Sequence, residues 1–368
     1  MKNKITSLVF ILAALILTAC SDTGGSPVAT TVEEDKQAIK ESFTNVGVLL
    51  ASFEKVSIYK FAEEFVEIDE NDELNPPEYS IELLTKFMSQ EGLSFDFTDN
   101  RFPYAVNAGD YAWNASDNNW KKSSSSKIKI QFPCSENSSK NDCVIDFKEY
   151  EDKKVKLPRE SVYLPTKINL DFSQSDKSLL SVEASASYNE FGIPKSIAAK
   201  AVSDPLVFNV NLDQKSSSHF VAKASVSDKT NSKANLSLSL EAKVNKAISS
   251  YTDFNDLDLD FVGFELKQDK LALKGGINVY ELNKIEEKLE AAYEEEDIEA
   301  IMKLQKSMSE HIDLQVLYQN SEVGTIKIEV SAEGDSEFVI YYKDGTKENT
   351  EVFYQQFMSE TLAIFAAK

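Results

Sequence analysis

The chain begins with helical hydrophobic patterns. Near the amino terminus, apolar residues recur at steps of four and three, which places them on one helix face: Ile39, Phe43, Val46, Leu50 and Phe53. A second helix is predicted over 56–68, and a third from Ser80 to Gly92. Pro76 and Pro77 interrupt the pattern between them. We therefore expect residues 32–93 to form an N-terminal helical segment.

From about residue 93 the hydrophobic period changes to two. Apolar and polar residues alternate in a series of short segments: 127–132, 144–147, 168–172, 182–188, 206–212, 220–226 and 236–244. Turn residues separate these segments. Such alternation with short connections predicts antiparallel strands with one covered face and one wet face. The connections are too short for crossover helices, so we expect no parallel pairing in this stretch.

The last third of the chain returns to helical periodicity over 282–308, with a break expected within 294–297. Strands are predicted at 312–318, 325–330 and 337–343, and Thr350 is expected to begin a last helix. Helices segregated from an antiparallel sheet define the α+β class. We expect a large antiparallel sheet, as a meander or half-barrel, with amphipathic helices packed on its apolar face. Residues 94–368 and 32–93 are expected to form one body.

The first residues have the pattern of an export signal. Lys2 and Lys4 precede an apolar run from Leu8 to Leu17 that is shorter than the ~20 residues of a membrane span. The run ends in Leu17-Thr18-Ala19-Cys20, which resembles the bacterial lipobox. The resemblance implies that residues 1–19 are a signal peptide removed before Cys20, and that Cys20 carries a diacylglyceryl group and an acylated amine. The alternative is an ordinary secretory peptide that happens to end in cysteine.

A lipid-modified Cys20 predicts a protein anchored to a membrane by acyl chains, because more than one buried chain makes attachment stable. Residues 20–31 comprise this cysteine and a flexible tether rich in Gly, Ser, Thr and Pro. Ser21, with no Asp at that position, favours the outer membrane under the common sorting rule. The expected location is therefore the cell envelope.

The composition of the chain argues against some classes of partner. The 368 residues include 61 acidic and 39 basic side chains, for a formal charge of -22. Nucleic acid needs a basic surface, so we expect no nucleic-acid partner. The hydrophobic fraction of 42% supports a folded core.

Two cysteines remain once Cys20 is lipid-modified. Cys134 and Cys143 flank a polar loop between two predicted strands. Export places them in an oxidising compartment, where such a pair is expected to form a disulfide. Two free thiols are the alternative.

Aromatic residues are concentrated in the segment 110–120. It contains Tyr111 and both tryptophans of the chain, Trp113 and Trp120. Rings beside Asn and Asp can stack on a sugar or grip a peptide, so they are a candidate contact surface. The favoured alternative is a hairpin anchored by buried rings. Together with the lipobox, GDYAWN and LPTKINLDF are similar to segments of uncharacterised exported bacterial lipoproteins, a resemblance that implies no activity.

No catalytic constellation stands out in the sequence. Asp256, Asp258 and Asp260 alternate with apolar residues, but the Gly and Glu that a calcium loop needs are not at the required spacing. His219 and His311 are far apart and lack a metalloprotease motif, and there is no GxSxG turn or Gly-rich phosphate loop. We therefore expect no enzymatic activity, metal or cofactor.

The leading hypothesis is a non-enzymatic envelope lipoprotein that binds a hydrophobic ligand or an envelope protein. Small residues on the apolar strand faces could leave a crevice beneath the helices: Ala184, Ala186, Ala222 and Ala224. Envelope lipid carriers with a half-barrel and helical lid have a similar outline, an analogy of fold alone. The alternatives are a structural or interaction subunit without a cavity and, disfavoured, an envelope hydrolase.

Overall fold

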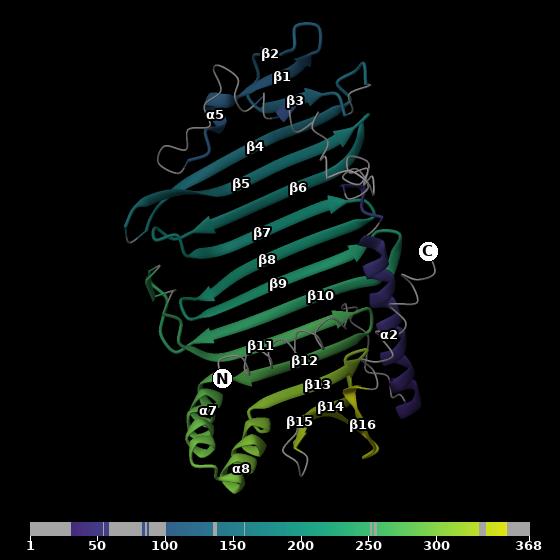
Figure 1. Cartoon of the computed structure of the whole chain (residues 1–368), viewed down its shortest axis with the longest axis vertical. Coiled ribbons are helices and arrows are strands. Elements are labelled where there is room, and N and C mark those ends of the chain that lie inside the picture. The colour runs from purple at the N-terminus through teal and green to yellow at the C-terminus, as the bar shows by residue number, and fades with distance from the viewer. Residues whose placement is uncertain are drawn as a thin grey trace. The chain divides into compact units, whose positions relative to one another are not determined.

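The computed structural model describes residues 31–53, 55–58, 83–84, 87, 101–134, 138–157, 159–250, 252–253, 256–330 and 336–351 (Figure 1). Several expectations lie outside these residues. They are the signal peptide, Cys20 with nearly all of its tether, most of the helices expected over 56–68 and 80–92, and the last helix beyond residue 351.

The chain forms two compact units. Unit 1 comprises residues 1–52, 214–247 and 256–368, and unit 2 comprises residues 53–213 and 248–255. The sequence had instead predicted one body with a change of character near residue 93. The division differs because there are two separate hydrophobic clusters, one in each unit, and neither coincides with the helical segment.

Unit 2 is built on strands in the order β2-β1-β3-β4-β5-β6-β7-β8. From β3 onward each strand pairs antiparallel with the next one in the chain, so most of this unit is a meander (Figure 1). The strands are β1 Gly109–Asn114, β2 Asn119–Ser123, β3 Ile128–Phe132, β4 Cys143–Lys156, β5 Ser161–Gln174, β6 Lys177–Tyr188, β7 Pro194–Ser203 and β8 Leu206–Ser216.

One pair in unit 2 corrects the expectation that parallel strands are excluded. β1 and β3 are parallel, with Gly109 opposite Ile128 and Ala112 opposite Gln131. β2 is antiparallel to β1 and pairs with the edge of β1 opposite to β3. The strand β2 therefore brings the chain back to the end where β1 began, and β3 can then run parallel to β1. No crossover helix is needed, which is why the short connections did not prevent parallel pairing.

Unit 1 is also a meander, with its strands in the order β9-β10-β11-β12-β13-β14-β15-β16. Its strands are β9 His219–Asp228, β10 Asn231–Val244, β11 Leu259–Gln268, β12 Leu271–Asn278, β13 Ile312–Tyr318, β14 Ser321–Val330, β15 Ser336–Tyr342 and β16 Lys347–Asn349. All pairings found in this unit are antiparallel. The described residues form mostly β-sheet with a few helices, so the α+β class is confirmed in broad terms.

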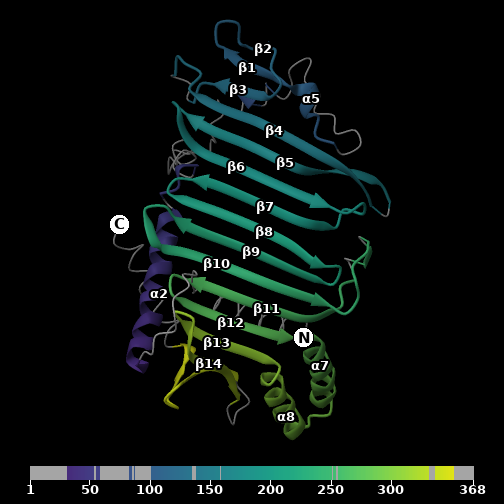
Figure 2. The same cartoon turned by 180° about the vertical axis from the view of Figure 1, so that it is seen from behind.

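The described helices begin with caps that the sequence supplies. α2 (Val32–Phe53) opens with a capping box, in which Thr31 Oγ1 accepts from the Glu34 N–H (3.3 Å) and Glu34 Oε2 accepts from the Thr31 N–H (2.7 Å). α7 (Val279–Glu294) and α8 (Ile298–Ser309) are capped by Asn278 and Asp297. Both views show α7 and α8 side by side (Figures 1 and 2). The break predicted within 294–297 is confirmed. The remaining helix is the short α5 (Tyr104–Asn107) in unit 2.

Helix side chains reach the core of unit 1. Ile39 of α2 and Leu282 of α7 are buried and belong to one cluster with strand residues such as Leu266, Leu314 and Val323. The predicted helical face of α2 is thus buried at Ile39 and Val46, whereas Phe53 at its end is 40% exposed.

Several strands escaped prediction, among them β7 and β12. In β7 alanines occupy both faces, so alternation between apolar and polar residues is hidden. β12 contains Gly275 and Gly276, which the sequence pattern reads as a turn. A Cβ on Gly276 would lie 2.5 Å from the Phe261 ring of the neighbouring strand, so the ring takes the place of a side chain there.

Candidate functional site

The meander of unit 2 carries an apolar face that is only half covered. Cross-strand partners share a face, and the registers place Ala184 between Ile168 and Ala199, with Ala199 opposite Val210. We call the residues on this side of β5 to β8 the open apolar face: Ile168, Leu170, Val182, Ala184, Ala186, Ile197, Ala199, Ala201, Phe208, Val210 and Leu212. None of these side chains is fully buried, and Val210 is 48% exposed.

A few residues cover one end of this face. Phe53, at the end of α2, packs edge-on against Phe208 with ring centroids 5.8 Å apart. Beyond it, Ser57 donates through its N–H (2.7 Å) to Asp204 O, and the Ile58 N–H donates to Ser203 Oγ (3.0 Å). The chain after α2 is therefore fastened to the β7–β8 turn.

The opposite side of the same strands is polar. It carries Lys167, Glu183, Ser185, Lys200 and Asn211. A shallow hollow of about 390 Å³ over these strands is lined mainly by this polar side. Hydrogen bonding to Glu149 raises the pKa of Lys167, so this side remains charged at neutral pH. The two sides of the strands thus differ sharply in chemistry.

Unit 1 has a corresponding apolar side that becomes covered along the sheet. On β9 and β10, Ala222 pairs with Leu240, which is 39% exposed. One strand further, Phe264 lies opposite Leu240 and Leu266 opposite Leu238, and both β11 side chains are buried. They belong to the cluster that includes helix residue Ile39. This apolar side is therefore buried at β11 and exposed at Leu240.

The small residues predicted to line a crevice lie on these two apolar sides. Ala184 and Ala186 are on the open apolar face of unit 2, and Ala222 and Ala224 are on β9 of unit 1. Ala184 and Ala222 are half-buried. The structure therefore places them on sheet surfaces belonging to different units.

The aromatic segment is part of the core, which corrects the predicted aromatic contact surface. Tyr111, Trp113 and Trp120 are 0%, 6% and 5% exposed. Trp113 and Trp120 face each other across the β1–β2 hairpin with ring centroids 5.6 Å apart. Trp120 Nε1 also donates to Leu83 O (3.1 Å). The rings alternate inward on a hairpin whose other face is wet, so the anchored hairpin is the correct alternative.

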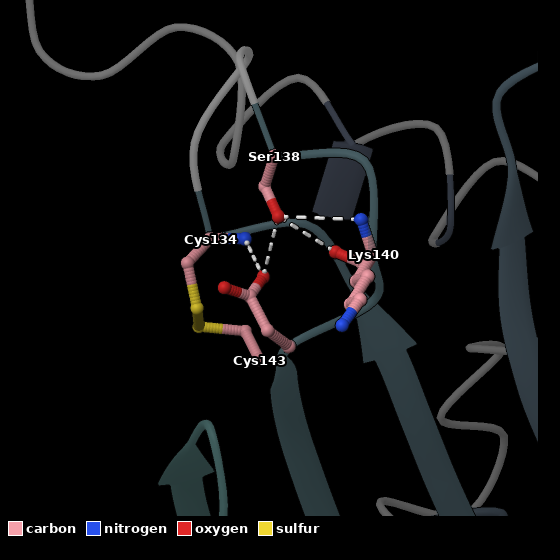
Figure 3. Close-up of a disulfide and its surroundings, with 5 residues drawn as sticks. Cys134, Ser138, Lys140 and Cys143 are labelled. Atoms are coloured by element: carbon pink, nitrogen blue, oxygen red, sulfur yellow. Dashed lines mark hydrogen bonds between the residues drawn. A yellow bond between two sulfur atoms is a disulfide. The ribbon is translucent and has the colours of Figure 1, made fainter.

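The structure contains the disulfide between Cys134 and Cys143 (Figure 3). Both cysteines are buried in the same cluster as the hairpin rings. Asp142 holds the loop that they close, because its Oδ1 accepts from the Cys134 N–H (2.9 Å) and lies 3.1 Å from Ser138 Oγ. The bridge thus ties the start of β4 to the hairpin core, which is a structural role.

The remaining polar candidates are held in structural contacts. Among Asp256, Asp258 and Asp260, only Asp260 lies within a strand, β11. His219 Nε2 lies 3.0 Å from Glu241 Oε1. In the described part of the chain, no group of three or more His, Cys, Asp or Glu side chains is arranged to hold a metal ion.

No protein-family model, curated protein or solved structure matches this chain. Of the helices in the described ranges, none combines the length and apolar character needed to cross a membrane. The geometry must therefore carry any functional argument. Sequence reasoning found most strands of the open apolar face but missed β7, which contributes Ile197 and Ala199 at its centre.

Proposed function

We propose that this chain is a membrane-anchored lipoprotein of the cell envelope that binds a hydrophobic ligand through the open apolar face of unit 2. Its anchor is the acylated Cys20 that the lipobox resemblance implies, and its expected location is the outer membrane. The observation that supports binding is the row of partly exposed aliphatic side chains on β5 to β8, of which Val210 is 48% exposed.

Covering the exposed apolar area of these side chains is favourable. Complete burial of a Val, Leu or Ile side chain contributes ~1.5–3 kcal/mol relative to full exposure. Val210 is about half exposed and Ile197 and Leu212 are less so, and covering the three would then yield on the order of 1–3 kcal/mol. Contiguous exposed apolar surface of this kind is typical of interaction sites. An acyl chain is a suitable occupant, because it requires no hydrogen bonds from the face.

Two further elements belong to this proposal. We keep the expectation that amphipathic helices pack on the apolar side of the sheet, and the shared cluster of Ile39 and Leu282 with strand residues supports it. We also propose that the protein works without catalysis. An interaction subunit that binds an envelope protein on the same face is the second candidate, favoured by the open shape of this face.

The test compares matched charges on the two sides of one strand. Val210→Glu places a carboxylate on the open apolar face, whereas Asn211→Glu places the same charge on the polar side of β8. Both variants are made in the Cys20→Ala chain, so that the acyl chains of the anchor do not compete with the fatty-acid probe for the face. An environment-sensitive fluorescent fatty acid should bind the parent saturably, and Val210→Glu should weaken it at least tenfold while Asn211→Glu does not. If no saturable binding is found, or if the two charged variants weaken binding equally, the ligand-binding proposal is wrong. The interaction subunit is then the better proposal.

A further inference from the structure

A second feature of unit 2 is a hollow of about 540 Å³ beside α5, which adjoins the open apolar face because its Tyr150 pairs with Ile168. Four aromatic side chains line it: Phe102, Tyr104, Tyr150 and Tyr163. Its volume falls within the ~300–1,000 Å³ typical of small-molecule sites. No motif in the sequence pointed to it.

Two irregularities in the β4–β5 ladder build this hollow. The register shifts between Phe147 and Glu149, so that Phe147 and Tyr150 come to the same side, with ring centroids 6.3 Å apart. It shifts again between Glu151 and Asp152. Bulges commonly re-aim side chains next to binding sites. Phe102 packs edge-on against Tyr150 at 5.1 Å, which completes one wall.

A charged pair forms the opposite edge. Arg101 donates from Nε to Asp152 Oδ2 (2.8 Å) and from Nη2 to Asp152 Oδ1 (3.0 Å). Its guanidinium carbon lies 4.7 Å from the Tyr163 ring centroid. The Asp152 side chain is 4% exposed, whereas that of Arg101 is 56% exposed. Only two of the five guanidinium N–H donors are used by Asp152, so the others face the hollow or solvent.

The tyrosines add neutral hydroxyl groups. Burial, followed by the charge of Asp152, raises the pKa of Tyr150. Burial likewise raises the pKa of Tyr104, whose hydroxyl donates to Phe147 O (2.7 Å). Both phenols therefore stay protonated at neutral pH. The hollow therefore combines flat aromatic rings with the paired guanidinium of Arg101 and carboxylate of Asp152.

Three ligand classes fit this chemistry poorly. An acyl chain would cover the Arg101–Asp152 pair without replacing its bonds to water, which is costly. A cationic ligand would meet Arg101 already seated on the Tyr163 ring. An anion would meet the carboxylates of Glu151 and Asp152 on a chain of charge -22.

We infer that this aromatic hollow binds a neutral saccharide. A sugar ring presents C–H groups that stack on an aromatic face, and its hydroxyl groups both donate and accept hydrogen bonds. The ring of Tyr150 supplies the stacking face, because Arg101 and Lys154 already lie over the Tyr163 ring. The free guanidinium donors of Arg101 and the Tyr150 hydroxyl supply fixed partners for vicinal sugar hydroxyls.

The test uses the mature lipidated protein in nanodiscs and three neutral probes: maltotetraose, cellotetraose and tetra-N-acetylchitotetraose. Saturation-transfer NMR and titration calorimetry should detect binding of at least one. Tyr150→Ala and Arg101→Lys should each weaken it at least tenfold, because one removes the stacking face and the other the planar fork. Tyr280→Ala is the matched control, since Tyr280 is 45% exposed on α7 in unit 1.

Tyr150→Phe keeps the ring and distinguishes lost stacking from lost folding, so it should lose less affinity than Tyr150→Ala. The inference is overturned if no probe binds, or if a bound probe is unaffected by both Tyr150→Ala and Arg101→Lys in proteins with unchanged circular dichroism. Fatty-acid binding at the open apolar face is measured separately with the Val210 and Asn211 variants, so failure of either proposal leaves the other intact.

Discussion

Reduction of the Cys134–Cys143 disulfide should destabilise unit 2 selectively. The bridge closes a loop of ten residues, for which chain entropy predicts about 2–3 kcal/mol. Both sulfurs are buried in the cluster that holds Trp113 and Trp120, so the loss acts directly on the hairpin core. With a urea dependence of ~1–3 kcal/mol per molar, the midpoint should fall by roughly 1–2 M.

The two tryptophans make the assay specific. Both lie in unit 2, so their fluorescence reports unfolding of that unit, whereas far-UV circular dichroism reports strands of both units. We expect reductant to lower the urea midpoint of the fluorescence transition. The part of the circular dichroism change that comes from unit 1 should keep its midpoint. The double variant Cys134→Ala/Cys143→Ala is the control, because reductant should not shift it further. A fully reduced protein, verified by thiol labelling, with an unchanged fluorescence midpoint would refute the argument.

Three further predictions concern the anchor, the hairpin and acid stability. Cys20→Ala should abolish acyl labelling and release the protein from the membrane fraction; a variant that stays there without acyl chains would contradict the lipoprotein proposal. Trp120→Phe should lower the stability of unit 2 by about 1–3 kcal/mol, because Leu83 O loses its indole donor in a buried site; urea unfolding followed by Trp113 fluorescence measures this, and Tyr280→Ala should have no effect. Burial raises the pKa of Asp228, but hydrogen bonds from Thr230 and Ser52 lower it more, so the net shift is downward. This carboxylate therefore stabilises unit 1 above about pH 4 and the contribution is lost as pH falls through its lowered pKa, so Asp228→Asn should lose less stability than the parent between pH 7 and pH 3 in urea titrations; equal losses would exclude this role.

Local patterning predicted the strands that separate apolar from polar residues. β8 and β10 alternate cleanly, and the structure has them at the predicted places. β7 and β12 do not alternate, because alanine or glycine occupies positions where a polar or apolar side chain would mark the face. The Phe261 ring that covers Gly276 comes from a neighbouring strand, and sequence periodicity carries no information about such a contact.

Burial was harder to predict than strand location. The apolar stripes of β8 and β11 look equivalent in the sequence, yet Val210 is 48% exposed and Leu266 is 1% exposed. Leu266 belongs to a buried cluster drawn from several strands and from Ile39, and alternation along one strand does not show which stripe joins such a cluster. The aromatic hollow was missed for a related reason: the bulge after Phe147 brings Tyr150 to its side, and a strict period of two places these residues on opposite faces.

Covering the polar side of β5 to β8 and covering their open apolar face change the free energy in opposite directions. On the polar side, Lys148 is paired with Asp171 and Lys167 with Glu149 (2.7 Å), and hydrogen bonding to these acids raises the pKa of each lysine. Solvent-exposed pairs of this kind contribute little to stability, but covering them removes water that solvates four charges. The open apolar face loses only unfavourable contacts with water when it is covered. A ligand that approaches these strands therefore gains free energy on the side of Val210 and loses it on the side of Asn211, and this asymmetry lets one strand supply both the test variant and its control.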